Sequence, residues 1–312
     1  MTVVREAGAN KPNEAMERLL YEVKKLIVGQ DHLLEAMVVA LLARGHLLVE
    51  GVPGLAKTMA IKTLADAIGG DFNTSLGPVF TNLLLADEIN RAPAKVQSAL
   101  LEVMQERQVT IGHETHKVPE PFLVMATQNP IETEGTYALP EAQVDRFMLK
   151  VLVGYPSPTE EFVIVERQTS PAEPVQEVLS TADLLELQRK VDLVYVDPAL
   201  NQYAVRLATA TRAPGKHGMP EIAHYITYGA SPRASINLIL TARALAFVRG
   251  RNYALPQDVI DMARDVIRHR LVLSFEALSD NVTSDAILST VLGRVPVPVV
   301  PLREPTNGRV SA

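Results

Sequence analysis

The sequence predicts an α/β domain built on a parallel sheet, followed by an all-α domain. An apolar run, Leu47 to Val49, precedes a loop containing glycine and proline and then a helix-compatible stretch, 59–67. A second apolar run, Leu83 to Ala86, ends in two adjacent carboxylates. Beyond residue 170 the spacing of apolar residues is helical only. Strands that alternate with helices favour a parallel sheet, and the helical remainder favours a second domain.

The composition excludes several classes of protein. The chain has no cysteine, which excludes disulfides, cysteine-based zinc sites and thiol chemistry. Its formal net charge of −6 argues against a large basic surface for nucleic acid. The longest apolar candidate, Leu33 to Ala43, contains Glu35 and is shorter than the roughly 18 residues of a membrane span. The polar start at Arg5 and Glu6 lacks the apolar core of a signal peptide, so we expect a cytoplasmic protein.

The stretch GVPGLAKT, Gly51 to Thr58, lies between the first strand and a helix. This context is typical of a P-loop (Walker A), whose backbone N–H groups point at a polyphosphate. Ala56 departs from the usual pattern, because a second glycine is expected there. A plain strand-to-helix turn would share the loose pattern. In the P-loop interpretation the nucleotide contacts are Gly51, Pro53, Gly54, Leu55, Ala56, Lys57, Thr58 and Met59.

The stretch LLLADE, Leu83 to Glu88, favours the P-loop over the plain turn. Four apolar residues form a buried strand, and Asp87 and Glu88 emerge at its carboxyl end, where ligands bind in open α/β sheets. We expect Lys57 to contact the β and γ phosphates of ATP, and Thr58 and Asp87 to hold Mg²⁺. Glu88 is then free to polarise the attacking water. These residues together predict an ATPase.

Four stretches follow one another in the order seen in one protein family. They are GVPGLAKT, LLLADEINRAPAKVQSALLEVMQERQVT, ATQNPIETEGTYALPEAQVDRF and, around Arg233, GASPRA. Over residues 26–296 the chain resembles MoxR-type AAA+ ATPases. The resemblance implies an AAA+ P-loop NTPase core, with parallel strands in the order 5-1-4-3-2, followed by an all-α lid. It also implies hydrolysis of ATP to ADP and phosphate.

The same resemblance assigns four further residues. Asn129 would be the sensor near the γ-phosphate, although an Asn-Pro step is also a common turn. Arg146 would be an arginine finger for the neighbouring subunit, or instead one half of a surface ion pair with Asp145 or Glu141. Arg233 would be the second sensor, in cis or in trans, or a solvated residue of its helix. Gln30 would lie beside the adenine, or only mark a helix break.

A length of 312 residues fits two domains. We expect a mobile tail at 1–13, an α/β nucleotide-binding domain at 14–170, an all-α lid at 171–294 and a proline-rich tail at 295–312. Helical spacing, caps and prolines predict helices at 14–27, 31–44, from Pro93, up to 168, and then at 198–212, 232–248, 257–270 and 284–292. The stretches 108–111 and 115–118 flank Gly112 and predict a β-hairpin.

One segment is too short for the family pattern. Only the 12 residues from Asp71 to Asn82 connect Gly70 to the second predicted strand, whereas a strand and a helix need about 5 and 11 residues. Strand 2 is therefore expected to be missing. Either the core has a real deletion, or the sequence is closed up over absent residues. We favour the second, with the break beside Asn73, because the first leaves an apolar strand at the sheet edge.

The resemblance implies a homo-oligomeric ring, expected to be a hexamer, that couples ATP hydrolysis to remodelling or activating a protein client. Proteins with von Willebrand factor A domains are the client class that it implies. Two alternatives share parts of this pattern. A nucleic-acid motor or loader would have the same core and hairpin, but the negative charge argues against it. A nucleotide-binding scaffold with little turnover would have the same loop, but would not need Glu88.

Overall fold

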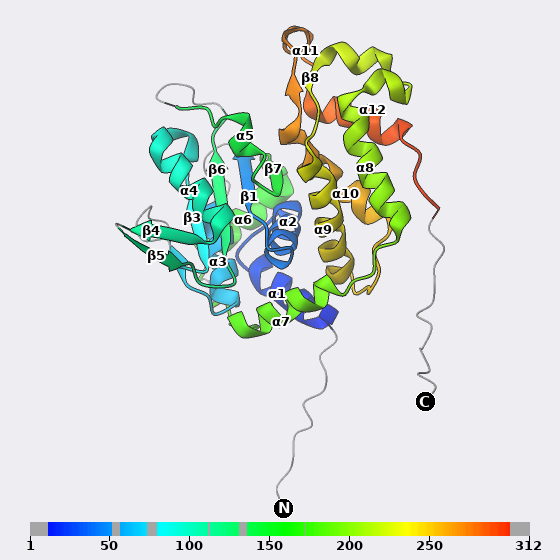
Figure 1. Ribbon diagram of the computed structural model, residues 1–312. Helices are drawn as coiled ribbons and strands as arrows, with labels where there is room; N and C mark the ends of the chain where they lie inside the picture. The colour runs from blue at the N-terminus through cyan, green and yellow to red at the C-terminus, as the bar shows by residue number, and fades with distance from the viewer. Residues whose placement is uncertain are drawn as a thin grey trace, which may run out of the picture.

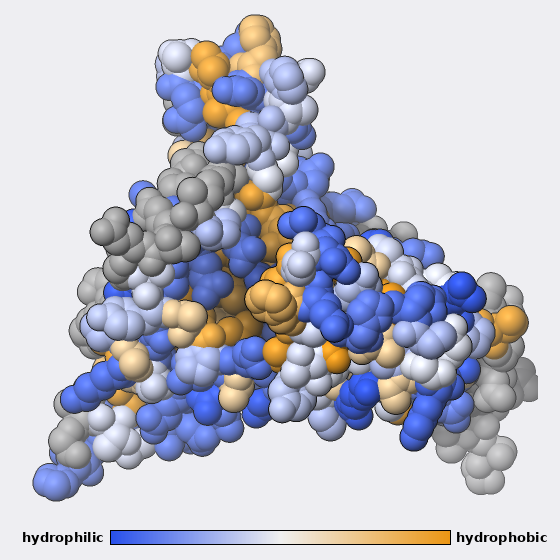
Figure 2. Space-filling view, turned by 90° about the horizontal axis from the view of Figure 1, so that it is seen from above, coloured by the Kyte–Doolittle hydropathy of each residue, from blue (hydrophilic) through white to orange (hydrophobic). Residues whose placement is uncertain are grey.

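The computed structural model describes residues 12–51, 57–73, 80–111, 113–130, 136–171 and 173–299. Figure 1 shows a sheet with its helices on one side of the molecule and a group of helices, α8 to α10 and α12, on the other. The β4–β5 hairpin projects at the outer end of the sheet side. Seen from above, hydrophilic residues cover most of the surface, and apolar residues gather in small groups between them (Figure 2).

The main sheet has five strands, and every neighbouring pair in it is parallel. Its order is β2-β3-β6-β1-β7. Counted without the hairpin, this is the predicted order 5-1-4-3-2, so the predicted fold class is confirmed. The strands are β1 (Leu47–Gly51), β2 (Phe72–Asn73), β3 (Leu83–Ala86), β6 (Leu123–Gln128) and β7 (Leu149–Val153).

The expectation that strand 2 is missing is wrong. Phe72 pairs with Leu83 and Asn73 with Leu84, so β2 forms the edge and β3 is covered on that side. The expectation failed because it used a mean strand length, and β2 needs only two residues. The break that we expected beside Asn73 involves Thr74, which lies outside the described residues. That part of the interpretation stays a prediction.

The helices of the sheet side follow the predicted spacing, except the four-residue α5, which was not predicted. They are α1 (Pro12–Lys24), α2 (Asp31–Leu42), α3 (Lys57–Ala67), α4 (Ala94–Glu106), α5 (Glu141–Val144) and α6 (Pro158–Thr169). Their ends differ from the predicted ones by up to three residues, the usual uncertainty of helix termini. The predicted hairpin is confirmed with its second strand shifted by one residue, as β4 (Gln108–Ile111) and β5 (Glu114–Lys117).

The second half is helical, with one exception. Its helices are α7 (Thr181–Asp192), α8 (Pro198–Arg212), α9 (Pro232–Val248), α10 (Pro256–Ile267), α11 (Phe275–Ser279) and α12 (Ser284–Arg294). The expectation of helices only is wrong, because β8 (Ile226–Tyr228) and β9 (Val272–Leu273) form a small antiparallel sheet. Strands this short carry no periodic signal. Two of the predicted helices, α8 and α9, have the expected bounds, each with proline in its first turn.

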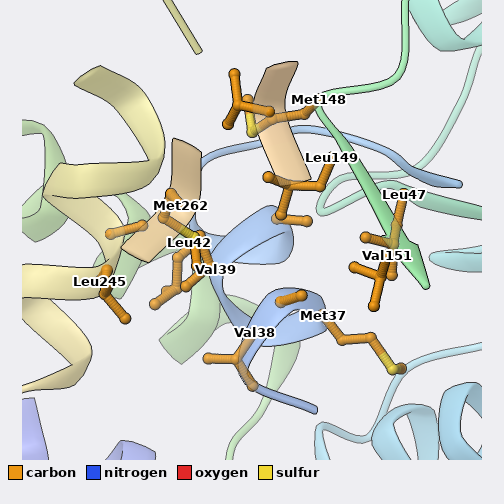
Figure 3. Close-up of a cluster of buried hydrophobic side chains, with 14 of the residues drawn as sticks. Met37, Val38, Val39, Leu42, Leu47, Met148, Leu149, Val151, Leu245 and Met262 are labelled. Atoms are coloured by element: carbon orange, nitrogen blue, oxygen red, sulfur yellow. The ribbon is translucent and has the colours of Figure 1, made fainter. Parts of the chain in front are cut away.

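The two halves share one core, and α2 lies at its centre. Nine of the 12 residues of α2 are buried, so it has no solvent-facing side of the usual width. Figure 3 shows Val39 and Leu42 of α2 on the side of Met262 and Leu245 of the second half, and Met37 on the side of Val151 of β7. Side chains packed on both sides of one helix fix how the second half sits on the sheet.

Candidate functional site

A cavity of about 1360 Å³ opens beside the carboxyl ends of β3 and β6. It follows α3 along almost its whole length and reaches the last turns of α1 and α6, and it is larger than most small-molecule pockets. The residues that line it are mainly charged or polar: Tyr21, Lys24, Lys25, Leu26, Lys57, Thr58, Met59, Lys62, Thr63, Asp66, Asp87, Glu88, Asn129, Glu166, Arg167, Gln168, Ser170, Pro171 and Glu173.

Six residues that the sequence predicted for the site line this cavity together, and they come from three separate segments: Lys57, Thr58, Met59, Asp87, Glu88 and Asn129. Parallel pairing brings the segments together, because it places the carboxyl ends of β1, β3 and β6 at one edge of the sheet. Of the other predicted contacts, Pro53, Gly54, Leu55 and Ala56 lie outside the described residues. Gln30 precedes α2 and is not part of the cavity lining.

Lys57 begins α3 and extends back toward the end of β1. Its Nζ donates a hydrogen bond of 2.6 Å to the carbonyl oxygen of Gly51. Burial lowers the pKa of Lys57, and the charges of Asp87 and Glu88 partly offset this. A half-buried ammonium group at a helix N-terminus attracts anions, because the helix dipole adds to its charge. The position suits a polyphosphate.

Gly51 itself allows the neighbouring strand to approach. A Cβ atom at this position would lie 2.5 Å from the carbonyl oxygen of Val153 in β7. No side chain fits there without moving the backbone of β7 away from β1. The first glycine of the predicted loop is therefore required by strand packing, whatever it contributes to a ligand.

Thr127 organises the two carboxylates, and the sequence analysis gave it no role. Its hydroxyl donates to Asp87 Oδ1 over 2.5 Å and accepts from the backbone N–H of Glu88 over 2.8 Å. Thr127 is fully buried in β6, next to β3 in the sheet. The only signal in the sequence was its place in ATQNP, two residues before Asn129.

Glu88 has two unusual features. Its backbone is left-handed, with φ of 48°, a conformation that costs a non-glycine residue free energy and recurs at functional sites. Its carboxylate also pairs with Arg91 Nε at 2.8 Å. The backbone bond to Thr127 helps to hold the strained conformation. Asn129 is 5% exposed and follows β6 directly, so both side chains are held at the same edge.

These donors fit Mg²⁺ bound together with nucleotide phosphates. Magnesium prefers oxygen ligands and usually takes one or two carboxylates, with waters and phosphate oxygens completing its shell. Asp87 and the hydroxyl of Thr58 are such ligands, and both line the cavity. Among the described residues there is no group of three or more His, Cys, Asp or Glu side chains arranged to hold a metal ion alone.

Arg146 and Arg233 are not in the cavity lining; both lie toward the other edge of the sheet. Met148 donates to the carbonyl oxygen of His46, just before β1, which places Arg146 at the amino ends of the strands. A strand of five residues spans about 16 Å. Figure 1 likewise shows α5, which precedes Arg146, at the upper end of the sheet and α1 at the lower.

The alternative role of Arg146 as a partner of Asp145 or Glu141 is not observed among the described residues. Arg146 is exposed, and Asp145 instead binds two arginines of the second half. Arg233 Nη1 lies 3.0 Å from Asp145 Oδ2, and Arg270 Nε lies 2.8 Å from Oδ1. Ser231 caps α9 and also donates to Asp145, over 3.1 Å. Arg233 is thus not merely a solvated residue of its helix.

In the parts of the chain that the structure describes, no helix has the length and apolar character needed to cross a membrane.

Family models match three parts of the chain. Residues 70–149 match the "ATPase family associated with various cellular activities (AAA)", and residues 221–291 match the "AAA lid domain". Residues 14–82 match the "MoxR domain in the MoxR-vWA-beta-propeller ternary systems". The first model covers the part of the α/β domain from β2 to the start of β7, which includes Asp87, Glu88 and Asn129. The lid model covers α9, whose first turn carries Arg233.

Known relatives match over most of their length. Chaperone MoxR1 of Mycobacterium tuberculosis is 51% identical, with 91% of this chain and 83% of MoxR1 covered. Protein YeaC of Bacillus subtilis is 38% identical, with 89% and 93% covered. A crystal structure of a protein from Cytophaga hutchinsonii superposes with a TM-score of 0.88 at 40% identity, over 92% of this chain and 96% of that one.

The match to MoxR1 runs over 312 aligned positions but takes in only 91% of this chain. MoxR1 therefore has residues within the aligned span that this chain lacks. The identity nevertheless extends through both the sheet and the helical half. With the family models matched in chain order, this shows that the chain belongs to the MoxR family of AAA+ ATPases.

Proposed function

We propose that this protein hydrolyses ATP with Mg²⁺ and uses the reaction to remodel or activate a protein client. The observation that carries the proposal is the cavity, in which parallel strands hold an ammonium group, two carboxylates and an amide around one space. The chaperone name of MoxR1 supports the client part. In this assignment residues 14–170 bind the nucleotide and residues 171–294 are the lid.

The residues of the cavity divide the work. Lys57 would neutralise the β and γ phosphates, and Thr58 and Asp87 would hold Mg²⁺, which lowers the charge on the transferred phosphoryl group when bound. Glu88 would accept a proton from the attacking water. Its carboxylate pairs with Arg91 in the structure, so the water would have to compete with Arg91 for it. Asn129 would orient the water from the end of β6.

The position of Arg146 supports a ring. Arg146 is exposed at the amino ends of the strands, about one strand length from the subunit's own cavity, and so cannot reach it. It can serve only a cavity of another copy, as an arginine finger in trans. Arg233 binds Asp145, which directly precedes Arg146, so we assign Arg233 the same direction of action. Head-to-tail contacts of this kind close into rings, and we propose a hexamer.

We propose a protein with a von Willebrand factor A domain as the client. The matched family model is described by MoxR-vWA-beta-propeller systems, which supports this class. In this proposal the ATP-bound and ADP-bound states of the protein bind the client with different affinities, so hydrolysis switches between them. A nucleic-acid motor is not supported by any described surface, and the chain carries a net charge of −6.

Glu88→Gln should bind ATP normally but hydrolyse it about 10² to 10⁴ times more slowly, because the base is lost while the phosphate contacts remain. Lys57→Ala should instead lose ATP affinity, since its charge meets the ground-state phosphates. Binding is measured with a fluorescent ATP analogue and turnover by phosphate release. Normal turnover of assembled Glu88→Gln would reject its role, and normal affinity of Lys57→Ala would reject the P-loop.

Thr127→Val should lower kcat about 10- to 100-fold, because a hydrogen bond to a charged group contributes about 1.5–3 kcal/mol. Valine keeps the shape but frees Asp87 and the N–H of Glu88. Thr241→Val is the matched control: Thr241 is also fully buried, but its hydroxyl bonds only carbonyls of its own helix, α9. Equal loss in both variants would mean that Thr127 has no special role.

Arg146→Ala should reduce turnover about 10³- to 10⁵-fold, the range measured for arginine fingers, while ATP affinity is retained. Mixing these subunits with Lys57→Ala subunits should restore activity, because an intact finger then meets an intact P-loop at mixed interfaces. Phosphate release is followed across mixing ratios, with mixed assembly verified by mass photometry. No recovery at any ratio would show that Arg146 does not act in trans.

A Glu88→Gln ring loaded with ATP should hold its client, because the ATP state persists. We expect such a ring to retain a purified von Willebrand factor A domain from the same organism at least tenfold more than the ADP-loaded ring in a pull-down. The Glu88→Gln/Lys57→Ala variant, which should not bind ATP, is the control. Equal retention by all three forms, or none by any, would contradict this client class.

A further inference from the structure

Three consecutive residues of the lid, Arg268-His269-Arg270, form a short 3-10 turn between α10 and β9. All three reach across to the backbone of one segment of the α/β domain, residues 145–150. This segment contains Arg146 and leads into β7. The resemblance to the MoxR family implied a role for Arg146 but none for the lid residues that bind the backbone around it.

Arg270 uses all five of its N–H donors at this contact. Nε donates to Asp145 Oδ1 over 2.8 Å, and Nη2 donates to the carbonyl oxygens of Asp145 and Phe147 over 3.0 and 2.6 Å. Nη1 donates to the carbonyl of Met148 over 3.3 Å and to that of Val266 in α10. The side chain of Arg270 is only 1% exposed. A guanidinium group satisfied in this way has one position.

The two neighbours of Arg270 extend the contact. His269 Nε2 lies 3.1 Å from the carbonyl oxygen of Phe147, which also accepts from Arg270. Because a carbonyl oxygen can only accept, Nε2 carries the proton. Burial lowers the pKa of His269 well below its usual value, so the ring stays neutral near pH 7. Arg268 Nη1 donates to the carbonyl of Lys150 over 2.6 Å. The lid therefore binds backbone on both sides of Arg146.

The core on the far side of the segment completes the constraint. Phe147 and Leu149 are fully buried and Met148 nearly so, and Figure 3 shows Met148 and Leu149 directed into the cluster that contains Met262 of the lid. Residues 145 and 147–149 are thus fixed by hydrogen bonds and packing. Only the side chain of Arg146 projects into solvent. The backbone determines where that side chain can reach.

We propose that Arg270 is a positioning residue for Arg146: it fixes the backbone on either side of the finger and so aims it at the cavity of the neighbouring subunit. The inference rests on the proposed role of Arg146 in trans. It gives the lid of one subunit, through Arg146, a part in hydrolysis at the cavity of the neighbouring subunit. Because Asp145 also binds Arg233, the contact between Arg270 and Asp145 helps to position both Arg146 and Arg233.

Electrostatics explain why an arginine is required. Burial lowers the pKa of Arg270 to about 10, and the charge of Asp145 opposes this, so the group stays protonated at neutral pH. Lysine would keep the charge and could pair with Asp145. Its three donors lie on one nitrogen and cannot reproduce a planar fork that spans three carbonyls. Arg270→Lys should therefore preserve the fold's charge balance while loosening residues 145–147.

The first measurement compares Arg270→Lys with Arg251→Lys. Arg251 binds the buried Asp258 through two nitrogens within the lid, at 2.6 and 2.8 Å, and its hydrogen bonds among the described residues go to Tyr253 and Asp258, not to residues 145–150. Both changes weaken a buried arginine pair. We expect Arg270→Lys to lower kcat about 10²-fold, the effect of misplacing a catalytic group by about 1 Å, with ATP affinity unchanged. Arg251→Lys should keep its turnover. Equal losses would overturn the proposal.

The second measurement separates positioning from general damage. Mixing Arg270→Lys with Lys57→Ala subunits should restore turnover, because the P-loop of the first then meets a well-placed finger of the second. The double variant Arg146→Ala/Arg270→Lys should be no slower than Arg146→Ala alone. Without the Arg146 side chain, Arg270→Lys has no finger to misplace. No recovery on mixing, or a further loss in the double variant, would overturn the proposal.

One further variant keeps the outcome decisive. If Arg270→Lys does not assemble, Asp145→Asn replaces it in the same mixing, because asparagine has the same size but cannot balance the Arg270 charge. The test also distinguishes the two levels of inference. Normal turnover of Arg146→Ala would refute the finger itself. Recovery by mixing for Arg146→Ala but not for Arg270→Lys or Asp145→Asn would refute positioning alone.

Discussion

The parallel pairing of β6 with β3 on one side and β1 on the other is the constraint on which the site depends. The predicted site residues that line the cavity come from segments up to 72 positions apart, as Lys57 and Asn129 illustrate. Parallel strands in register bring their carboxyl ends to one edge. From there Thr127 can bond both Asp87 and the backbone of Glu88, which an antiparallel neighbour would place elsewhere.

The amino ends of the strands lie at the opposite edge of the sheet, away from the cavity. The amino ends of β1 and β7 face the lid turn that contains Arg270, and Arg146 leaves the sheet there. About 16 Å of strand lies between the two edges. In the function that we propose, this separation makes hydrolysis depend on the assembly, because Arg146 then serves the cavity of a neighbouring subunit. In that proposal the lid is part of the interface as well as a cover.

Sequence patterns predicted most of the fold, and the failures have physical causes. Helices α8 and α9 were predicted at their observed bounds because Asp197 and Ser231 are caps that act within three residues. The edge strand β2 and the small β8–β9 sheet were missed because two or three residues carry no periodicity and are stabilised by their partners. The alternative that Arg146 pairs with Asp145 or Glu141 is not observed among the described residues, where Asp145 instead binds Arg233 and Arg270.

The sequence by itself predicted the order of the longer strands and helices, the family, and the roles that we propose for Lys57, Asp87 and Glu88, because these follow from spacing and residue type along short stretches. The tertiary structure alone decided which distant groups meet. It assigned Thr127 to the two carboxylates and Asp145 to Arg233 and Arg270, which lie 88 and 125 positions away. Contacts over such distances depend on how α2 packs the lid against the sheet, and no local pattern encodes that packing.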